Sequence, residues 1–216
     1  MSERSVSRRR QQKRWYTLMA PEQFDRKAIG ETPADEPEQV YDRTSETTLG
    51  DITGNANENN VKLTFKVNDV GSDAAYTEFV RHELASDYLR SLVRRGSSKV
   101  AAVLTVRTKD DYRLRVQPVA FTTKRADHSQ QKAIRDAMTE VVERAAADHT
   151  YREFTDSIVR GRLSSAMYTE AKTIYPLRRV EVQKAVLDAH PEEVYEEEET
   201  AAGVDEADVA LDETEE

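Results

Sequence analysis

Apolar and polar residues alternate over residues 61–67 and again over residues 112–117. Successive side chains of a β-strand point to opposite faces, so each stretch predicts a strand with one buried face. In the second stretch the pattern turns Tyr112, Leu114 and Val116 inward and places Arg113 and Arg115 together on the outer face. That strand, over residues 112–122, is expected to form a hairpin with residues 98–107 around a turn at residues 108–111.

A different spacing marks the helices. Apolar residues recur every three or four positions from Ile134 to Ala145, which predicts a long amphipathic helix that begins near Asp127. Two shorter helices are expected over residues 151–159 and 163–172, with a break near Gly161, and a last strand over residues 180–186.

The patterns that predict secondary structure are weaker in the first hundred residues. We expect an extended segment over residues 14–19, a brief helix from Pro21 through Phe24 to Lys27, a strand over 40–48, and loops or turns over 30–37, 49–51 and 54–60. Helical spacing of Leu84, Tyr88, Leu89 and Leu92, with Gly96 at a cap position, predicts a helix whose last turn holds Arg94 and Arg95. The order of strands, helix, hairpin, helices and strand indicates an α+β fold with mostly antiparallel pairing.

The charged residues divide the chain into three parts. Residues 188–216 hold 14 acidic side chains and no Lys or Arg, which leaves 32 basic and 27 acidic side chains in residues 1–187, a net charge of +5. Six basic side chains and one acidic side chain fall within residues 1–20. We therefore expect a basic arm (1–20), a single α+β domain (21–187) and an acidic tail (188–216) that is disordered, because it has too few large apolar residues to offset chain entropy.

The composition limits the cellular compartment and the solvent conditions in which this chain is expected to function. Two hundred and sixteen residues are enough to bury a core, and the absence of cysteine excludes disulfides and thiolate zinc sites and suits a reducing cytoplasm. The longest apolar run, residues 100–104, is far shorter than the roughly 20 residues of a membrane helix. Arg outnumbers Lys by 22 to 10, which together with the acidic excess favours a proteome adapted to high salt. We expect a soluble, intracellular protein that binds no membrane.

No motif points to catalysis. The chain contains no nucleophile elbow, Walker loop, dinucleotide fingerprint or zinc-protease motif. Its four histidines, His82, His128, His149 and His190, lie far apart in sequence, and Glu140 and Glu143 are best explained as solvated charges on a helix. We expect no catalytic residue, no cofactor and no metal site.

Basic residues gather instead at the ends of the expected elements. Arg and Lys are suited to phosphate, and an indole ring can stack on an unpaired base, although Trp15 is better explained as an anchor of the arm in the core. No helix-turn-helix, zinc finger or RNP aromatic pair is present, so we expect a distributed phosphate-binding surface without sequence specificity. The candidate RNA contacts are Arg8, Arg9, Arg10, Lys13, Arg14, Trp15, Arg94, Arg95, Lys99, Arg113, Arg115, Lys124, Arg125, Arg160, Arg162, Arg178 and Arg179.

Six short motifs, in order along residues 13–187, resemble one family, the archaeal and eukaryotic small-subunit ribosomal proteins of the S-three-a type; the likeness is to its haloarchaeal members. They are Lys13-x-Trp15-x-x-Leu18-x-Ala20-Pro21-x-x-Phe24, Ile29-Gly30-Glu31-Thr32-x-Ala34, Leu49-Gly50-Asp51-Ile52-Thr53, Asp87-Tyr88-x-Arg90-Ser91-Leu92-x-Arg94-Arg95, Tyr112-x-Leu114-Arg115 and Ile174-Tyr175-Pro176-Leu177-Arg178-x-Val180. The family often has Gly at the positions of Asp42 and Asp111. Asp tolerates the left-handed conformation better than most residues, so the resemblance holds there.

The resemblance implies a structural constituent of the small ribosomal subunit, without catalysis, that supports translation. It implies a β-barrel-like sheet with packed helices, and a place on the platform near the mRNA exit. The implied partners are small-subunit rRNA, neighbouring small-subunit proteins and mRNA near its exit. The family assigns no catalytic or ligand residue, so the RNA contacts above rest on charge alone.

Two other functions remain open at this point. A transient RNA-binding module or translation factor would use the same basic surface, and composition does not separate it from a resident ribosomal protein. A hydrolase that uses Glu140 or Asp156 would require the fold to bring two carboxylates and a histidine into one pocket.

Overall fold

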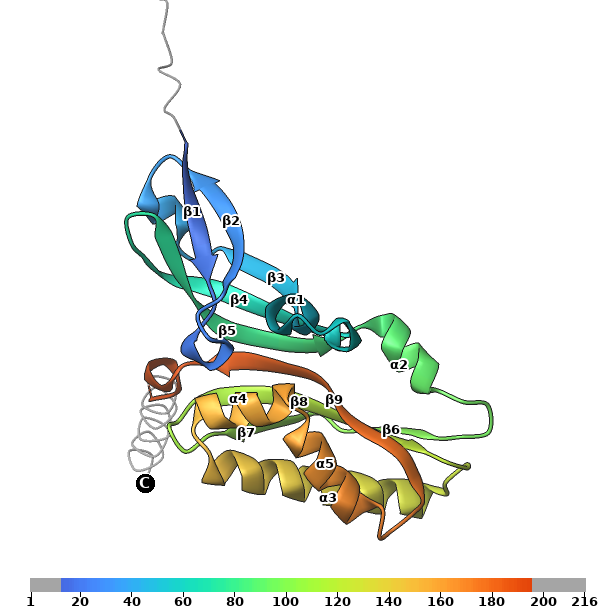
Figure 1. The fold of residues 1–216 in the computed structure, drawn as a ribbon. Coiled ribbons are helices and arrows are strands. Elements are labelled where there is room, and N and C mark those ends of the chain that lie inside the picture. The colour runs from blue at the N-terminus through green and yellow to red at the C-terminus, as the bar shows by residue number, and fades with distance from the viewer. Residues whose placement is uncertain (1–12, 196–216) are drawn as a thin grey trace, which may run out of the picture. The chain divides into compact units, whose positions relative to one another are not determined.

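The computed structural model describes residues 13–195 (Figure 1). Over this range the chain forms two compact units, one made of residues 13–59 and 63–80 and the other of residues 60–62 and 81–195. The described residues contain nine strands and five α-helices in mixed strand pairing, so the fold is α+β as the sequence predicts. Each unit is described below by itself.

The first unit is built on strands. β1 (Arg14–Met19) pairs antiparallel with β2 (Ala28–Ala34) and, at residues 17–19, parallel with the first residues of β5 (Ala74–Leu84). β4 (Val61–Val70) pairs with β5 and with β3 (Thr44–Thr48). The expected extended segment at 14–19 and strand at 61–67 are confirmed, whereas the parallel pairing of β1 with β5 has no counterpart in the sequence-based expectation.

Aromatic rings fill the core of the first unit. Phe24 packs edge-on against Phe65 with ring centroids 5.3 Å apart, and both rings contact Phe79. Beside them lies a second cluster of buried side chains that includes Tyr16, Leu18, Val40 and Val67. The alternation along β4 is therefore confirmed in detail, because Leu63, Phe65 and Val67 are all buried.

The expected loop at residues 30–37 and turn at residues 49–51 are wrong. Residues 30–34 belong to β2, an outer strand in which Pro33 is tolerated because it needs no ladder donor there. Residues 49–51 open α1 (Leu49–Thr53), whose first turn is fixed by a capping box between Thr48 and Asp51. Three short 3₁₀ helices complete the unit, η1 (Glu22–Phe24), η2 (Pro37–Val40) and η3 (Ala56–Glu58), so the strand expected at 40–48 is confined to 44–48.

Gly50 in α1 approaches its neighbours too closely for any side chain. A Cβ atom at this position would lie 1.8 Å from the Asn59 side-chain oxygen and 2.8 Å from the Asn55 carbonyl oxygen. We expect Gly50→Ala to lower the free energy of unfolding by about 2 kcal/mol, because the backbone at Asn55 must move and this outweighs the better helix propensity of Ala. Urea denaturation measures the change.

Gly30 provides the matched control for Gly50. A Cβ atom at Gly30 would have open space around it. Gly30→Ala should therefore leave the unfolding midpoint within experimental error, and equal effects of the two substitutions would contradict the close approach at Gly50.

The second unit holds a continuous antiparallel ladder. β8 (Arg113–Thr122) pairs on one side with β6 (Lys99–Ala101) and β7 (Leu104–Arg107), and on the other with β9 (Leu177–Ala189). The end of β5 adds to β9 through Arg81–Glu83. The predicted hairpin is confirmed, except that its first strand is interrupted between Ala101 and Leu104.

Three helices follow in the second unit. They are α3 (His128–Asp148), α4 (Tyr151–Val159) and α5 (Arg162–Ala171), and all three match the sequence-based prediction closely. Of these, α3 and α5 pack on strands of the ladder, and α4 packs against α3 and α5 (Figure 1). Gly161 separates α4 from α5 in a left-handed conformation with φ of 72°. Of the helices in residues 13–195, none is both long enough and apolar enough to cross a membrane.

The helix expected to end at Gly96 is shorter than predicted. α2 spans Ser86–Leu92, and Leu84 instead closes β5 as a buried strand residue. The backbone is already extended at Val93, so Arg94 and Arg95 follow the helix in a turn and do not occupy its last turn. Gly96 has φ of 81° and serves this turn.

The structure also bears on the two aspartates that replace the family's glycines and on the acidic end of the chain. Asp42 and Asp111 adopt the left-handed conformation, with φ of 61° and 64°, as expected of residues that stand where the family often has Gly. At the acidic end, β9 continues to Ala189 and a helical turn covers residues 191–195 with Val194 buried. The rest of the predicted tail and residues 1–12 of the predicted arm lie outside the described residues.

A closed sheet is not present in the described part of the chain. The order of strands begins at β2 and ends at β6, and no pairing among residues 13–195 joins the two. The barrel-like closure implied by the family resemblance is therefore not confirmed.

Candidate nucleic-acid interface

One end of the second unit collects three segments that are far apart in sequence. The turn after α2 is joined to the end of β8, because the backbone N–H of Ser98 donates to Thr122 Oγ1 at 2.8 Å and the Thr122 N–H donates to the Ser98 carbonyl at 3.0 Å. The segment after β8 is joined to the start of β9, because the Thr123 N–H donates to the Pro176 carbonyl at 3.1 Å. These bonds place the turn at 93–98, the segment at 123–126 and the start of β9 at one sheet end.

Further bonds close the same arrangement. The Arg178 guanidinium donates to the Leu92 carbonyl at 3.3 Å, which links β9 back to the end of α2. Ala126 N–H donates to Ser98 Oγ at 3.1 Å, and the Tyr175 hydroxyl donates to the Arg125 carbonyl at 3.1 Å. The backbone carrying these basic residues is thus held by hydrogen bonds at several points.

Six exposed cations project from this sheet end. Lys99 Nζ also donates to the Gln183 side-chain oxygen at 3.2 Å, which keeps this ammonium beside β9. Within residues 13–195 none of the six pairs with a carboxylate, so their charge remains available to an external anion. We call this set the cationic edge; its members are Arg94, Arg95, Lys99, Lys124, Arg125 and Arg178.

The arginines predicted on the outer face of β8 have an internal partner. Arg113 Nε lies 3.1 Å and Arg115 Nη2 lies 3.0 Å from the two oxygens of Asp188 on β9. Both arginines share one face, as the alternation predicts, but both contact the same carboxylate. Sequence spacing gives no sign of Asp188, which meets β8 only through strand pairing.

The arginines beside Gly161 and at the start of β9 are also in ion pairs. Arg160 Nε lies 2.6 Å from Asp156, and Arg162 reaches the other oxygen of the same carboxylate. Arg179 Nε lies 2.6 Å from Glu181, and this carboxylate raises the pKa of Arg179. These side chains remain largely exposed, so they can still face an anion, but with less free charge than the cationic edge.

The first unit presents a separate basic segment at the start of β1. Trp15 is 62% exposed, while its neighbour Tyr16 is fully buried. The expectation that Trp15 anchors the arm in the core is therefore wrong, because the strand turns Tyr16 inward and the indole outward. Lys13 and Arg14 are exposed beside it, and Arg8, Arg9 and Arg10 lie outside the described residues.

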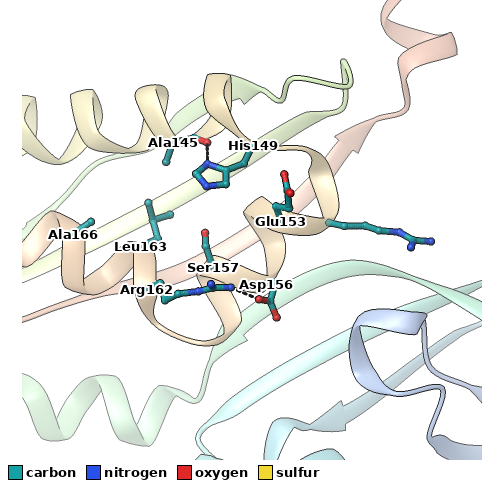
Figure 2. Close-up of a pocket in the computed structure, with 9 residues that line it drawn as sticks. Ala145, His149, Glu153, Asp156, Ser157, Arg162, Leu163 and Ala166 are labelled. Atoms are coloured by element: carbon teal, nitrogen blue, oxygen red, sulfur yellow. Dashed lines mark hydrogen bonds and ion pairs between the residues drawn. The ribbon is translucent and has the colours of Figure 1, made fainter.

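A cavity of about 520 Å³ between the end of α3, α4 and α5 holds the group of residues that a hydrolase would require (Figure 2). His149, Glu153, Asp156 and Ser157 all line it. Their contacts are nevertheless structural. His149 Nδ1 lies 2.8 Å from the Ala145 carbonyl, Ser157 donates to the Phe154 carbonyl at 2.7 Å, and Asp156 is held by two arginines.

The remaining carboxylate of this cavity is unsuited to proton transfer. Glu153 accepts the backbone N–H and the hydroxyl of Thr150 at the start of α4, and these bonds lower its pKa. A general acid or base near neutral pH needs the opposite shift. Glu140, the other residue considered for hydrolysis, pairs with Arg144 on the outer face of α3 and does not line the cavity. The hydrolase alternative therefore finds no catalytic geometry.

Comparison with known proteins finds relatives that match most of the chain. The chain is 66% identical over 212 residues to "Small ribosomal subunit protein eS1" of Haloarcula marismortui, with 98% of this chain and 100% of the relative covered. It is 67% identical over 205 residues to the protein of that name from Natronomonas pharaonis (95% and 100% covered) and 45% identical over 183 residues to the one from Archaeoglobus fulgidus (84% and 87% covered).

These relatives include proteins of halophilic archaea, as the excess of Arg over Lys and the acidic balance predict. Residues 2–191 match the model of the Ribosomal S3Ae family. That match covers most of the chain, and the sequence resemblance to this family is thereby confirmed. The chain belongs to the Ribosomal S3Ae family.

Proposed function

We propose that this chain is a structural constituent of the small ribosomal subunit in the cytoplasm, where it binds small-subunit rRNA and neighbouring proteins and supports translation. The family match and the names of the relatives support the place in the small subunit. The observation that supports the mode of RNA binding is the cationic edge, six exposed basic side chains that pair with no carboxylate of residues 13–195. No catalytic step belongs to this function.

High salt decides what kind of RNA contact such an edge can make. At ionic strengths near 1 M the screening length falls to about 3 Å, so long-range attraction contributes little. Binding then depends on direct hydrogen bonds between guanidinium groups and phosphate oxygens. Four of the six side chains of the cationic edge are arginines, which suits this requirement.

The finer location follows from the family resemblance. We place the chain on the platform of the small subunit near the mRNA exit, with mRNA as a neighbour. Lys13, Arg14 and Trp15 form the second proposed RNA contact, and the exposed indole supports stacking on an unpaired base. The predicted contacts by Arg8, Arg9 and Arg10 extend this segment.

Gradient fractionation of a lysate in high salt tests residence in the subunit. We expect the full chain to sediment with small subunits at one copy per subunit and to remain there after a wash in high salt. Recovery only in the free fraction, or complete loss during the wash, would contradict residence and favour a transient RNA-binding module or translation factor.

A further inference from the structure

A hollow of about 400 Å³ lies between the first turns of α5 and the start of β9, within the second unit. Three arginines line it, Arg160, Arg178 and Arg179, against one carboxylate, Glu181. The wall between them is formed partly by hydroxyl-bearing residues, among them Ser164 and Tyr168. We call this space the arginine hollow.

Ser164 is the wall residue whose hydroxyl is available for a new hydrogen bond. Its side chain is buried, with 7% of its surface exposed, yet its hydroxyl has no hydrogen-bond partner within residues 13–195. Ser164 lines the hollow, so its hydroxyl is open to a hydrogen-bond partner that enters this space, whether water or a ligand. The nearby Tyr168 hydroxyl, by contrast, already donates to the Leu177 carbonyl at 3.3 Å.

The arginines of the hollow differ in whether they pair with a carboxylate. Arg160 and Arg179 are each paired with a carboxylate, Asp156 and Glu181, at 2.6 Å. Among the residues that the structure describes, Arg178 donates only to the Leu92 carbonyl, a neutral acceptor, at 3.3 Å. A guanidinium that meets no carboxylate and faces a cavity with an unpaired hydroxyl favours an anionic occupant.

We infer that the arginine hollow seats one phosphodiester group of the bound RNA, with the Ser164 hydroxyl and the Arg178 guanidinium donating to its non-bridging oxygens. The inference rests on the proposed function and adds a defined phosphate site to it. Arg178 belongs both to the hollow and to the cationic edge, so an RNA strand that follows the edge passes the opening. The oxygens of a tetrahedral phosphate accept hydrogen bonds from several directions at once. This geometry suits a space that is lined by a hydroxyl and three guanidiniums.

Nuclear magnetic resonance on the ¹⁵N-labelled full chain tests the site. The chain is titrated separately with inorganic phosphate, a mixed-sequence single-stranded RNA and an acidic peptide. We expect the Ser164 and Ser165 amide signals and the Arg178 side-chain N–H signal to shift with phosphate and with RNA, and the RNA to saturate them at a concentration at least about tenfold lower. Signals that move with the peptide but not with RNA, or with phosphate but not with RNA, would overturn the inference.

The same titration separates this inference from the proposed function. Signals of Arg94 and Lys124 report on the cationic edge outside the hollow. If RNA moves the edge signals but not those of Ser164, the hollow is not a phosphate site while RNA binding stands. If RNA moves neither set, RNA binding by this surface fails as well.

Substitutions provide a second measurement. Arg178→Gln should weaken RNA binding about tenfold near 0.15 M salt and lower the slope of log affinity against log salt by about one. Ser164→Ala keeps the buried volume and should abolish the shift of the Ser165 signal with phosphate. Arg144→Gln, on the outer face of α3, and Ser157→Ala, whose hydroxyl is already bonded, are matched controls that should leave both measurements unchanged.

Discussion

Removing four charges from the cationic edge is expected to lower the affinity for small-subunit rRNA about a thousandfold near 0.15 M salt. Each phosphate contact contributes about 0.9 to the slope of log affinity against log salt, so four lost contacts flatten the slope by about 4. Near 1 M salt the two affinities should converge, and the remaining difference measures the direct hydrogen bonds alone. The substitutions are Arg94→Gln, Arg95→Gln, Lys124→Gln and Arg125→Gln, and filter binding over a range of KCl concentrations measures both quantities.

A variant with the same change in charge elsewhere controls for net charge. It carries Arg26→Gln, Lys66→Gln, Arg107→Gln and Arg144→Gln, four cations that each already pair with a carboxylate of this chain. Such exposed pairs contribute little to stability, so this variant should fold and retain most of its affinity. Equal losses of affinity in the two variants would show that RNA binding depends on the net charge of the chain and not on the cationic edge.

The second unit follows from local sequence signals far better than the first. α3 and α4 begin at capping boxes, Asp127 with Gln130 and Thr150 with Glu153, and the alternation along β8 matches its burial. β5 was not foreseen because its buried face includes Thr77 and His82, which interrupt the apolar pattern. β2 contains Gly30 and Pro33, which locally indicate a loop and are compatible with a strand only at the outer end of the order.

The sequence predicts which types of residue form the candidate interface, but it does not predict which of these residues lie together in the fold. Clusters of Arg and Lys at element ends are visible in the sequence, and six of these side chains, the cationic edge, share one sheet end. Which arginines carry free charge depends on strand pairing and tertiary contact, as with Arg113 and Arg115 at Asp188. A helical spacing of four could have indicated the pair of Asp156 with Arg160, whereas nothing local shows that Ser164 would be buried beside Arg178.

Acid should destabilise the chain between pH 6.5 and pH 4 because of one histidine. His82 in β5 is 3% exposed, its Nδ1 has no hydrogen-bond partner among the described residues, and burial lowers its pKa from 6.5 to about 4. Between these two values the unfolded chain binds a proton that the folded chain does not, so the free energy of unfolding falls as pH is lowered from 6.5 towards 4 and changes little above 6.5. The free energy of unfolding changes by about 1.4 kcal/mol for each pH unit, so over this range it is expected to fall by about 3 kcal/mol.

Replacement of the ring isolates this effect. His82→Leu cannot take up the proton, so its unfolding free energy, measured by urea denaturation, should stay nearly constant between pH 6.5 and pH 4.5 after any constant change from repacking. His128→Gln, at an exposed position on α3, should keep the full dependence of the unmodified chain. The shift arises from burial and not from an exposed ion pair, so high salt should not remove it. The lowered pKa values of Asp111 and Glu153 act at more acidic pH, so a His82→Leu variant that still loses stability between pH 6.5 and pH 5 would place the titrating group elsewhere.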